Sequence, residues 1–373
     1  MHRRQLIKAT SMAALAVIAQ RAKFVAAGEV GLKDHFEDDF LVGPMLSPGI
    51  LAKPEANHEA IVSKDFNAIT AENCMKWEGI QPSQGHFTWE LADKFVEYGV
   101  RHKMNIVGHV LVWHSQTPNY VFNDWRGNPR SAQSLQSMME QQIHLLAGRY
   151  KGKIWAWDVV NEAVTDDGKW RQSPWFKILG EDFVRLAFNT AREVDDKALL
   201  VYNDYNMHIP KKRDFITAFT RYFRATGMPL DAIGMQGHIG LDFPDFKQFE
   251  QSIIAYGKSG VKVHFTEVDV DVLPAAWDYI GAEISTEFEY SDKLNPYVDG
   301  LPKDVEQRLT DRYREFFELC LKHRDIIDRV SMWGVHDGEN WKNGFPVKGR
   351  TNYPLLFDRK LDPKPAYYEL LKL

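Results

Sequence analysis

The chain alternates short apolar runs with segments of helical periodicity, and it does so eight times. The apolar runs cover residues 40–45, 68–70, 106–113, 154–160, 198–202, 232–235, 261–265 and 329–334. Runs of this length, rich in branched and aromatic side chains, are typical of buried parallel strands, which need a helical crossover between them. Eight such units predict a closed (β/α)₈ TIM barrel. A doubly wound sheet is disfavoured because no G-x-G-x-x-G motif opens a helix after the first run.

The segments between the runs have the periodicity of helices that pack against a sheet. One of them carries apolar residues at helical spacing and is stopped by a glycine: Leu135, Met139, Ile143, Leu146, Tyr150 and then Gly152. We find no Pro-, Ser- or Gly-rich linker that would mark a second module. Residues 28–373 are therefore expected to form one domain.

Composition excludes some classes of function. With 44% apolar and 26% charged residues the chain is globular, and its net charge of −5 with no long basic run argues against nucleic-acid binding. Aromatic residues make up 13% of the chain, which suits a ligand with flat apolar faces such as a sugar ring. Because no Cys/His cluster has metal-ligand spacing, we expect neither a metal nor a cofactor.

The N-terminus has the pattern of an export signal. Arg3 and Arg4 precede a weakly apolar stretch at 12–19, and small residues at 25–27 resemble a cleavage site. The paired arginines favour a twin-arginine signal over a general secretory one, and the apolar stretch is too short to span a membrane. The sequence thus predicts a signal peptide at 1–27 and a bacterial protein that is exported to the periplasm or secreted.

Polar side chains follow nearly every predicted strand, where a barrel would gather them in one bowl at its C-terminal face. They are Glu72, Asn73, His114, Asn161, Glu162, Asn203, Asp204, Gln236, His238 and Glu267, with Trp333 on the last strand. Glu162 and Glu267 each end an apolar run. Two carboxylates aimed into one site are the minimum needed to cleave a glycosidic bond, one as acid and the other as nucleophile or base.

The segments around these residues resemble glycoside hydrolase family 10, the endo-β-1,4-xylanases. The matching segments are Thr70–Trp77, Trp113–Gln116, Trp157–Glu162, Tyr202–Asn206, Gly234–His238, Thr266–Asp269 and Trp333–Val335. They occur in order, and each lies at a predicted strand end. The resemblance covers the chain from about Phe40 to its C-terminus.

The resemblance implies a retaining hydrolase with Glu162 as acid/base and Glu267 as nucleophile. It implies that His238 hydrogen-bonds the nucleophile and that Asp269 orients this imidazole. The residues that it implies bind substrate are Glu72, Asn73, Lys76, Trp113, His114, Tyr120, Asn161, Tyr205, Gln236, His238, Trp333 and Trp341. Of these, Asn161 would bond the sugar 2-OH, and Trp333 and Trp341 would form walls of the reacting subsite. Tyr120 stands where the family often has Trp, so that wall would be smaller.

The expected ligands are xylan and xylo-oligosaccharides, and a monomer is expected. Two alternatives remain at this point: a β-1,4-glucanase with cellulase-like action, and a non-catalytic carbohydrate-binding barrel. The second alternative has no need for two carboxylates beside Asn161 and His238.

Overall fold

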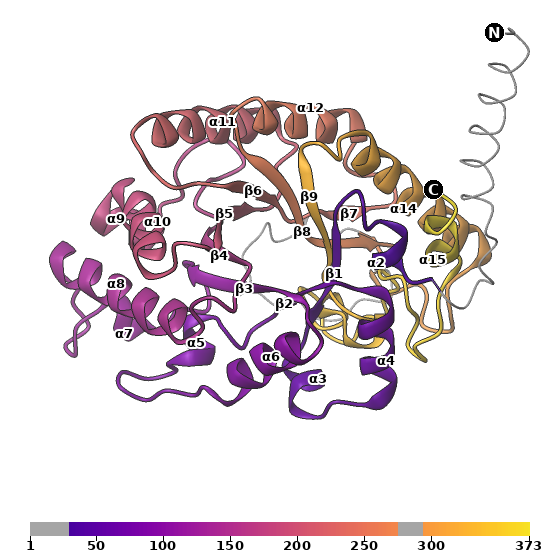
Figure 1. Cartoon of the computed structure of the whole chain (residues 1–373), viewed down its shortest axis with the longest axis horizontal. Coiled ribbons are helices and arrows are strands. Elements are labelled where there is room, and N and C mark those ends of the chain that lie inside the picture. Colours follow the sequence, from indigo (N-terminus) through magenta and orange to yellow (C-terminus); the bar gives the residue numbers. More distant parts are fainter. Residues whose placement is uncertain (1–29, 275–293) are drawn as a thin grey trace, which may run out of the picture.

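The computed structural model of the chain describes residues 30–274 and 294–373 and has a closed barrel of parallel strands (Figure 1). The signal peptide expected at 1–27 lies outside the described residues. The barrel strands are β1 (Leu41–Leu46), β2 (Ala68–Ala71), β3 (Asn105–Val112), β4 (Ala156–Asn161), β5 (Leu199–Asp204), β6 (Ala232–Met235), β8 (Lys262–Asp271) and β9 (Ile327–Met332). Pairing of β1 with β9 and of β6 with β8 closes the ring. The predicted TIM barrel is confirmed.

Helices surround the strands in Figure 1, as expected for crossovers that cover the outside of a barrel. The longer ones are α4 (Ala56–Asp65), α6 (Glu90–Arg101), α8 (Ala132–Arg149), α10 (Asp182–Val194), α11 (Pro210–Ala225), α12 (Phe246–Gly257) and α14 (Lys303–Lys322). Shorter ones are α2 (Leu32–His35), α3 (Pro48–Ala52), α5 (Trp77–Ile80), α7 (Asn119–Phe122), α9 (Pro174–Leu179) and α15 (Pro365–Leu370), with 3₁₀ turns η2 (Asp337–Glu339) and η3 (Trp341–Asn343). No helix in the described part of the chain combines the length and apolar character that crossing a membrane requires.

Helix α8 shows how the sequence pattern produces this layer. The Ser131 side chain caps the helix by accepting the backbone N–H of Ser134 at 3.2 Å. The predicted stripe from Leu135 to Leu146 is fully buried against the barrel. Gly152, just after the helix, has φ of 73°, which a glycine adopts without strain.

The strands differ from the prediction near the site. Strand β8 continues to Asp271, so Glu267 lies within a strand and not at the strand-to-loop junction that we expected. The physical reason is a short additional strand, β7 (His238–Gly240), which pairs with the end of β8 from Asp269 to Asp271. This strand supplies backbone partners above the barrel rim. Its three residues contain no apolar run, and the sequence pattern therefore missed it.

Tight packing between neighbouring strands is clearest at Gly108 on β3. Gly108 is in register with Trp157 on β4, whose side chain is buried. A Cβ atom added to Gly108 would lie 2.1 Å from Cζ3 of that indole. The ring therefore occupies the space that a side chain on β3 would need.

Candidate active site

Glu162 follows the last residue of β4 and is almost fully buried, with 7% of its surface exposed. Three N–H groups donate to its carboxyl group. Trp113 Nε1 lies 3.0 Å from Oε2, and Gln236 Nε2 and Asn161 Nδ2 lie 2.9 and 3.2 Å from Oε1. All three partners are neutral, so they orient the carboxyl group without adding a charge to it.

The backbone of Glu162 has an uncommon conformation, with φ of 57°. A non-glycine residue in this left-handed region costs free energy and persists only where the surroundings hold it. Its N–H donates to the carbonyl of Asn203 at 2.9 Å, and its carbonyl accepts Arg171 Nε at 2.8 Å. Arg171 also donates from Nη2 to the hydroxyl of Tyr205 at 2.5 Å. The conformation that aims Glu162 is thus held from both sides of the residue.

Glu267 points into the same site from β8 and is also buried. Its Oε1 accepts Asn203 Nδ2 at 2.8 Å, and its Oε2 lies 3.2 Å from His238 Nε2. Burial by itself raises the pKa of this carboxyl group. The hydrogen bond from His238, the charges of His109 and His238 and the bond from Asn203 outweigh burial, so the pKa lies below its ordinary value.

His238 is held by a fully buried carboxylate on its other side. Its Nδ1 lies 3.0 Å from Oδ1 of Asp269. Burial lowers the pKa of the imidazole, but the charge of Asp269 and the bonds to Asp269 and Glu267 raise it to about 9. Asp269 also lies 2.7 Å from Lys342 Nζ and accepts Trp341 Nε1 at 2.9 Å. Although burial opposes it, the positive charges of His238 and Lys342 lower the pKa of Asp269 to about 2.

Two amide side chains connect the carboxyl groups. Asn203 Nδ2 donates both to Glu267 at 2.8 Å and to Oδ1 of Asn161 at 3.0 Å. Asn161 in turn donates to Glu162. Thr266 Oγ1 donates to Oδ1 of Asn203 at 2.6 Å, which fixes the amide orientation. The positions of the two carboxyl groups are therefore coupled through a continuous buried network.

Polar residues from the loop after β2 form one wall of the site. Lys76 Nζ donates to Asn73 Oδ1 at 2.9 Å and to Gln116 Oε1 at 2.7 Å, and it lies 4.9 Å from the ring centre of Trp113. Burial lowers the pKa of Lys76, while the charges of Glu72, Glu267 and Glu162 oppose that shift. Burial likewise raises the pKa of Glu72. This wall is electrostatically coupled to both carboxyl groups.

Aromatic rings pack around His238. The ring of Trp341 lies 5.1 Å from that of His238, and Trp333 lies 6.5 Å from it. Trp333 also meets His109 edge-on at 5.4 Å and is only 5% exposed. Trp341 is less buried than Trp333.

The other predicted binding residues extend along the loop after β3. The ring of His114 lies 6.0 Å from that of Trp113. The hydroxyl of Tyr120 donates to the carbonyl of Gln81 at 2.9 Å and accepts Trp77 Nε1 at 3.0 Å. These bonds tie Tyr120 to helix α5 and leave its ring only partly buried.

Five residues that take part in these networks were not among the predicted catalytic or substrate-binding residues: His109, Gln116, Arg171, Asn203 and Lys342. Asn203 and Gln116 stand within the motifs that carry the family resemblance, and Lys342 adjoins Trp341, so their position was a usable signal. His109 lies inside an apolar strand and pairs with Asp158, with Nδ1 2.9 Å from Oδ2. Only the three-dimensional structure brings Arg171 to Glu162.

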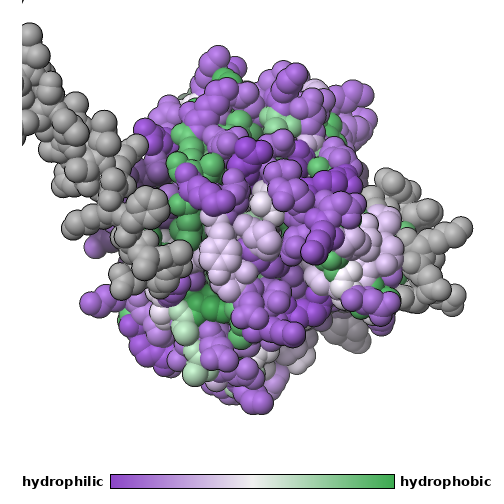
Figure 2. Space-filling model, turned by 90° about the vertical axis from the view of Figure 1, so that its right-hand side faces the viewer, coloured by the Kyte–Doolittle hydropathy of each residue, from purple (hydrophilic) through white to green (hydrophobic). Residues whose placement is uncertain are grey.

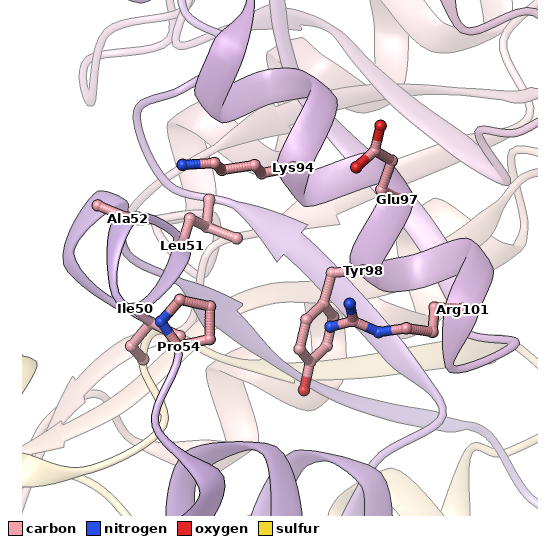
Figure 3. A pocket seen from close by; sticks show the side chains of 8 residues that line it. All are labelled: Ile50, Leu51, Ala52, Pro54, Lys94, Glu97, Tyr98 and Arg101. Atoms are coloured by element: carbon pink, nitrogen blue, oxygen red, sulfur yellow. The ribbon is translucent and has the colours of Figure 1, made fainter.

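The carboxyl pair is distinct from the pocket of about 150 Å³ shown in Figure 3. That pocket lies between α3 and α6, and the charged side chains of Lys94, Glu97 and Arg101 line it together with apolar residues. None of the active-site residues described in this subsection lines that pocket. Within the described residues, no three or more His, Cys, Asp or Glu side chains are grouped so as to hold a metal ion.

Comparison with known proteins gives a consistent family. The family model described as glycosyl hydrolase family 10 matches residues 31–373. Endo-1,4-beta-xylanase A of Xylanibacter ruminicola is 44% identical over 349 residues, covering 94% of this chain and 95% of that protein. Endo-1,4-beta-xylanase of Geobacillus stearothermophilus is 38% identical, covering 92% of this chain and 98% of that protein.

Solved structures agree with these matches. A GH10 endoxylanase retrieved from a sugarcane soil metagenome has a TM-score of 0.89 and 52% identity, covering 92% of this chain and 99% of that one. A mutant protein in complex with xylotriose has a TM-score of 0.82 and 29% identity, covering 92% of this chain and 100% of that one.

Proposed function

The chain belongs to glycosyl hydrolase family 10, and on this premise we propose that it hydrolyses internal β-1,4-xylosidic linkages of xylan by a retaining double displacement. The observation that carries the proposal is the pair of buried carboxyl groups with unlike partners. Glu267 is hydrogen-bonded to the imidazole of His238, which also pairs with Asp269, whereas the side-chain hydrogen bonds to Glu162 come from neutral N–H donors. The substrate of the xylanase relatives supplies the chemical class.

In the first step a carboxylate oxygen of Glu267 attacks the anomeric carbon. The bond from that carbon to the glycosidic oxygen breaks, and this oxygen takes a proton from Glu162. The low pKa of Glu267 supports this role, because the nucleophile has to be ionised before the substrate reacts.

In the second step water attacks the same carbon of the glycosyl-enzyme. Glu162, now a carboxylate, takes the proton of the water, and the ester bond to Glu267 breaks. The ester carries no negative charge, so Glu162 no longer faces a second carboxylate when it takes up its second role as a base.

The remaining residues are proposed to bind the sugar chain. Asn161 bonds the 2-OH beside the reacting carbon, and its contacts with both Asn203 and Glu162 support this placement. Trp333 and Trp341 crowd the C5 position, which favours xylose over glucose because xylose lacks the hydroxymethyl group. The sugars on the non-reducing side are bound by polar side chains, and further aromatic rings line the site: Glu72, Asn73, Lys76, His114 and Gln236, with Trp113, Tyr120 and Tyr205.

The test compares two alanine variants by leaving group. We expect Glu267→Ala to lose turnover of both xylan and activated aryl xylosides. Glu162→Ala should remain able to form the glycosyl-enzyme from an aryl xyloside with an acidic phenol, since that phenol departs without protonation, but should be nearly inactive on xylan. Its intermediate should accumulate, because no base remains to activate water.

Azide decides the assignment because it needs no base. Added azide should restore turnover of Glu162→Ala and give a β-glycosyl azide, whereas Glu267→Ala should give only an α-azide through the space left by the nucleophile. Formation of a β-azide by Glu267→Ala would show that the two roles are the reverse of those proposed here. Rates of the unsubstituted chain on xylan and on cellulose test the substrate class: faster hydrolysis of cellulose would favour a β-1,4-glucanase.

We also propose that residues 1–27 are a twin-arginine export signal and that a monomeric catalytic domain begins at Gly28. The support is the Arg3-Arg4 pair, the weak apolar stretch and the small residues before position 28. N-terminal sequencing of the exported protein tests the cleavage site. Unimpaired export of an Arg3→Lys, Arg4→Lys variant would contradict the twin-arginine assignment while leaving export itself in place.

A further inference from the structure

Trp125 is a large aromatic residue that lies almost entirely in solvent instead of packing against the protein. The residue is 85% exposed, whereas the other exposed large hydrophobic residues of the described chain, such as Tyr222 at 55%, retain much more contact with the protein. Indole has a large apolar surface whose exposure to water is unfavourable. The face shown in Figure 2 is mostly hydrophilic, and Trp125 is the most exposed of the large hydrophobic residues in the described chain.

The backbone presents Trp125 on a stiff turn. Residues 123 and 129 form an antiparallel bridge, and the Asp124 N–H donates to the carbonyl of Asn128 at 2.8 Å. The Asp124 carboxylate accepts the N–H groups of Arg126 and Asn128 at 2.8 and 2.9 Å. A side chain closing a turn from inside in this way is an Asx-type turn, which limits the motion of the turn that carries the indole.

The same turn is anchored to the segment that carries Tyr120. Arg130 donates from Nε and Nη2 to the Tyr120 carbonyl at 3.0 and 2.9 Å, and its N–H donates to the Phe122 carbonyl at 2.9 Å. This segment leads from β3 to α8, and the connections that follow barrel strands lie at the C-terminal face. Trp125 thus belongs to the face of the molecule that holds the two carboxyl groups.

One face of the indole is available. The guanidinium of Arg126 lies 4.5 Å from the ring centre and covers one side, while the high exposure leaves the other side open. Asp124, Arg126 and Asn128 place polar groups on the same turn as the ring. A pyranose stacks its C–H face on one indole and turns its hydroxyl groups toward such neighbours. A protein partner would need a contiguous apolar patch of several hundred Å² instead.

From these observations we propose that Trp125 is a stacking platform for the main chain of β-1,4-xylan, in addition to the residues that hold the reacting sugar. The proposal rests on the proposed function. A platform of this kind raises affinity for a polymer and does not act on the reacting bond. Its loss should therefore weaken binding of xylan without changing the reaction of a substrate too short to reach it.

The experiment uses the full chain with Glu267→Gln, so that bound xylan is not hydrolysed. Retardation of this protein in native gels that contain soluble xylan is compared with and without Trp125→Ala, with Tyr222→Ala on α11 as the matched control for an exposed aromatic residue. We expect Trp125→Ala to weaken xylan binding roughly two- to tenfold, as for loss of one aromatic contact. Tyr222→Ala should bind as its parent does, and Trp125→Phe should recover part of the loss.

A short substrate provides the second readout. In the chain with Glu267 intact, Trp125→Ala should leave kcat/KM for an aryl xylobioside unchanged. Equal retardation of Trp125→Ala and its parent would overturn the proposal. The proposal would also be overturned if the parent self-associates in sedimentation without xylan and Trp125→Ala abolishes that self-association, because Trp125 would then contact a second copy of the chain. If the unsubstituted chain fails to hydrolyse xylan, the proposed function fails instead, and the two failures are distinguishable.

Discussion

At the scale of single residues, the two carboxyl groups differ in the charge of what surrounds them. Glu267 shares a hydrogen bond with an imidazole whose pKa is raised to about 9. Glu162 meets an indole and two amides. Environment alone can thus assign unlike tasks to chemically identical side chains, as in other pairs of carboxyl groups in hydrolases.

Replacing Asp269 by asparagine should move the pH profile. The charge of Asp269 raises the pKa of His238, so its loss lowers that pKa and leaves the imidazole neutral over more of the working range. Glu267 then loses a positive partner and its pKa rises. Because the proposed nucleophile must be ionised, the acid limb of kcat/KM should shift to higher pH, and kcat/KM on that limb should fall about tenfold.

The measurement is kcat/KM of an aryl xylobioside against pH. Asp271→Asn is the matched control, since the carboxylate of Asp271 lies 3.5 Å from the same Lys342 amine, whereas His238 pairs with Asp269. Its acid limb should stay in place. A uniform loss for Asp269→Asn at every pH, with no movement of the acid limb, would show that Asp269 acts only on structure.

At the scale of elements, the turn after β4 orients Glu162, the residue that we propose as acid/base. The left-handed φ of Glu162 is stabilised by contacts to β5 and to Arg171. The hydroxyl of Tyr202 on β5 also accepts the next N–H, that of Ala163, at 3.1 Å. Sequence pattern located Glu162 at a strand end, but a backbone conformation fixed by distant residues has no local signature.

We expect Arg171→Met to impair proton transfer selectively. Without the bonds to the Glu162 carbonyl and Tyr205, the carboxyl group is less well aimed, and kcat/KM on xylan should fall about tenfold. The same constant for an aryl xyloside with an acidic phenol should change little, because that leaving group needs no proton. Arg171→Lys should recover part of the activity on xylan. Equal losses on both substrates would indicate general disruption of the site.

The elements were predictable where apolar pattern alone determines them. All eight barrel strands overlap the predicted runs, and the buried stripe of α8 is as expected. The apolar pattern failed to predict β7 and the outer end of β8. Residues such as His238 and Asp269 are in strands there because their backbones pair with each other. Strand residues whose side chains serve a site are polar, so they lack the apolar periodicity from which strands are predicted.

At the scale of the whole molecule, strand packing leaves little tolerance inside the barrel wall. Gly108→Ala should lower the free energy of unfolding by about 1–3 kcal/mol, because the added methyl group overlaps the buried ring of Trp157. Gly148→Ala is the opposite case: it lies in α8, and the added atom would approach only Val194 Cγ1 at 3.8 Å. That change should raise the free energy of unfolding by about 0.5–1 kcal/mol.

Urea unfolding of both variants and the unsubstituted protein measures these differences. Equal stability of Gly108→Ala and the unsubstituted protein would mean that Trp157 can move aside at no cost. Both substitutions add the same methyl group. Comparing the two variants therefore separates the effect of steric overlap from the effect of lost backbone entropy in the unfolded chain.

The closure of the barrel between β1 and β9 affects the order in which the chain can fold. Leu41 to Pro44 pair with Arg329 to Met332, which come from opposite ends of the described chain. Contacts so distant in sequence form late, because a long loop has to be ordered before they stabilise anything. During synthesis β1 must therefore wait, with one edge unpaired, until nearly the entire chain has emerged. An interrupted chain would expose that edge to other chains, so the interval before β9 arrives is when this protein is most prone to aggregate.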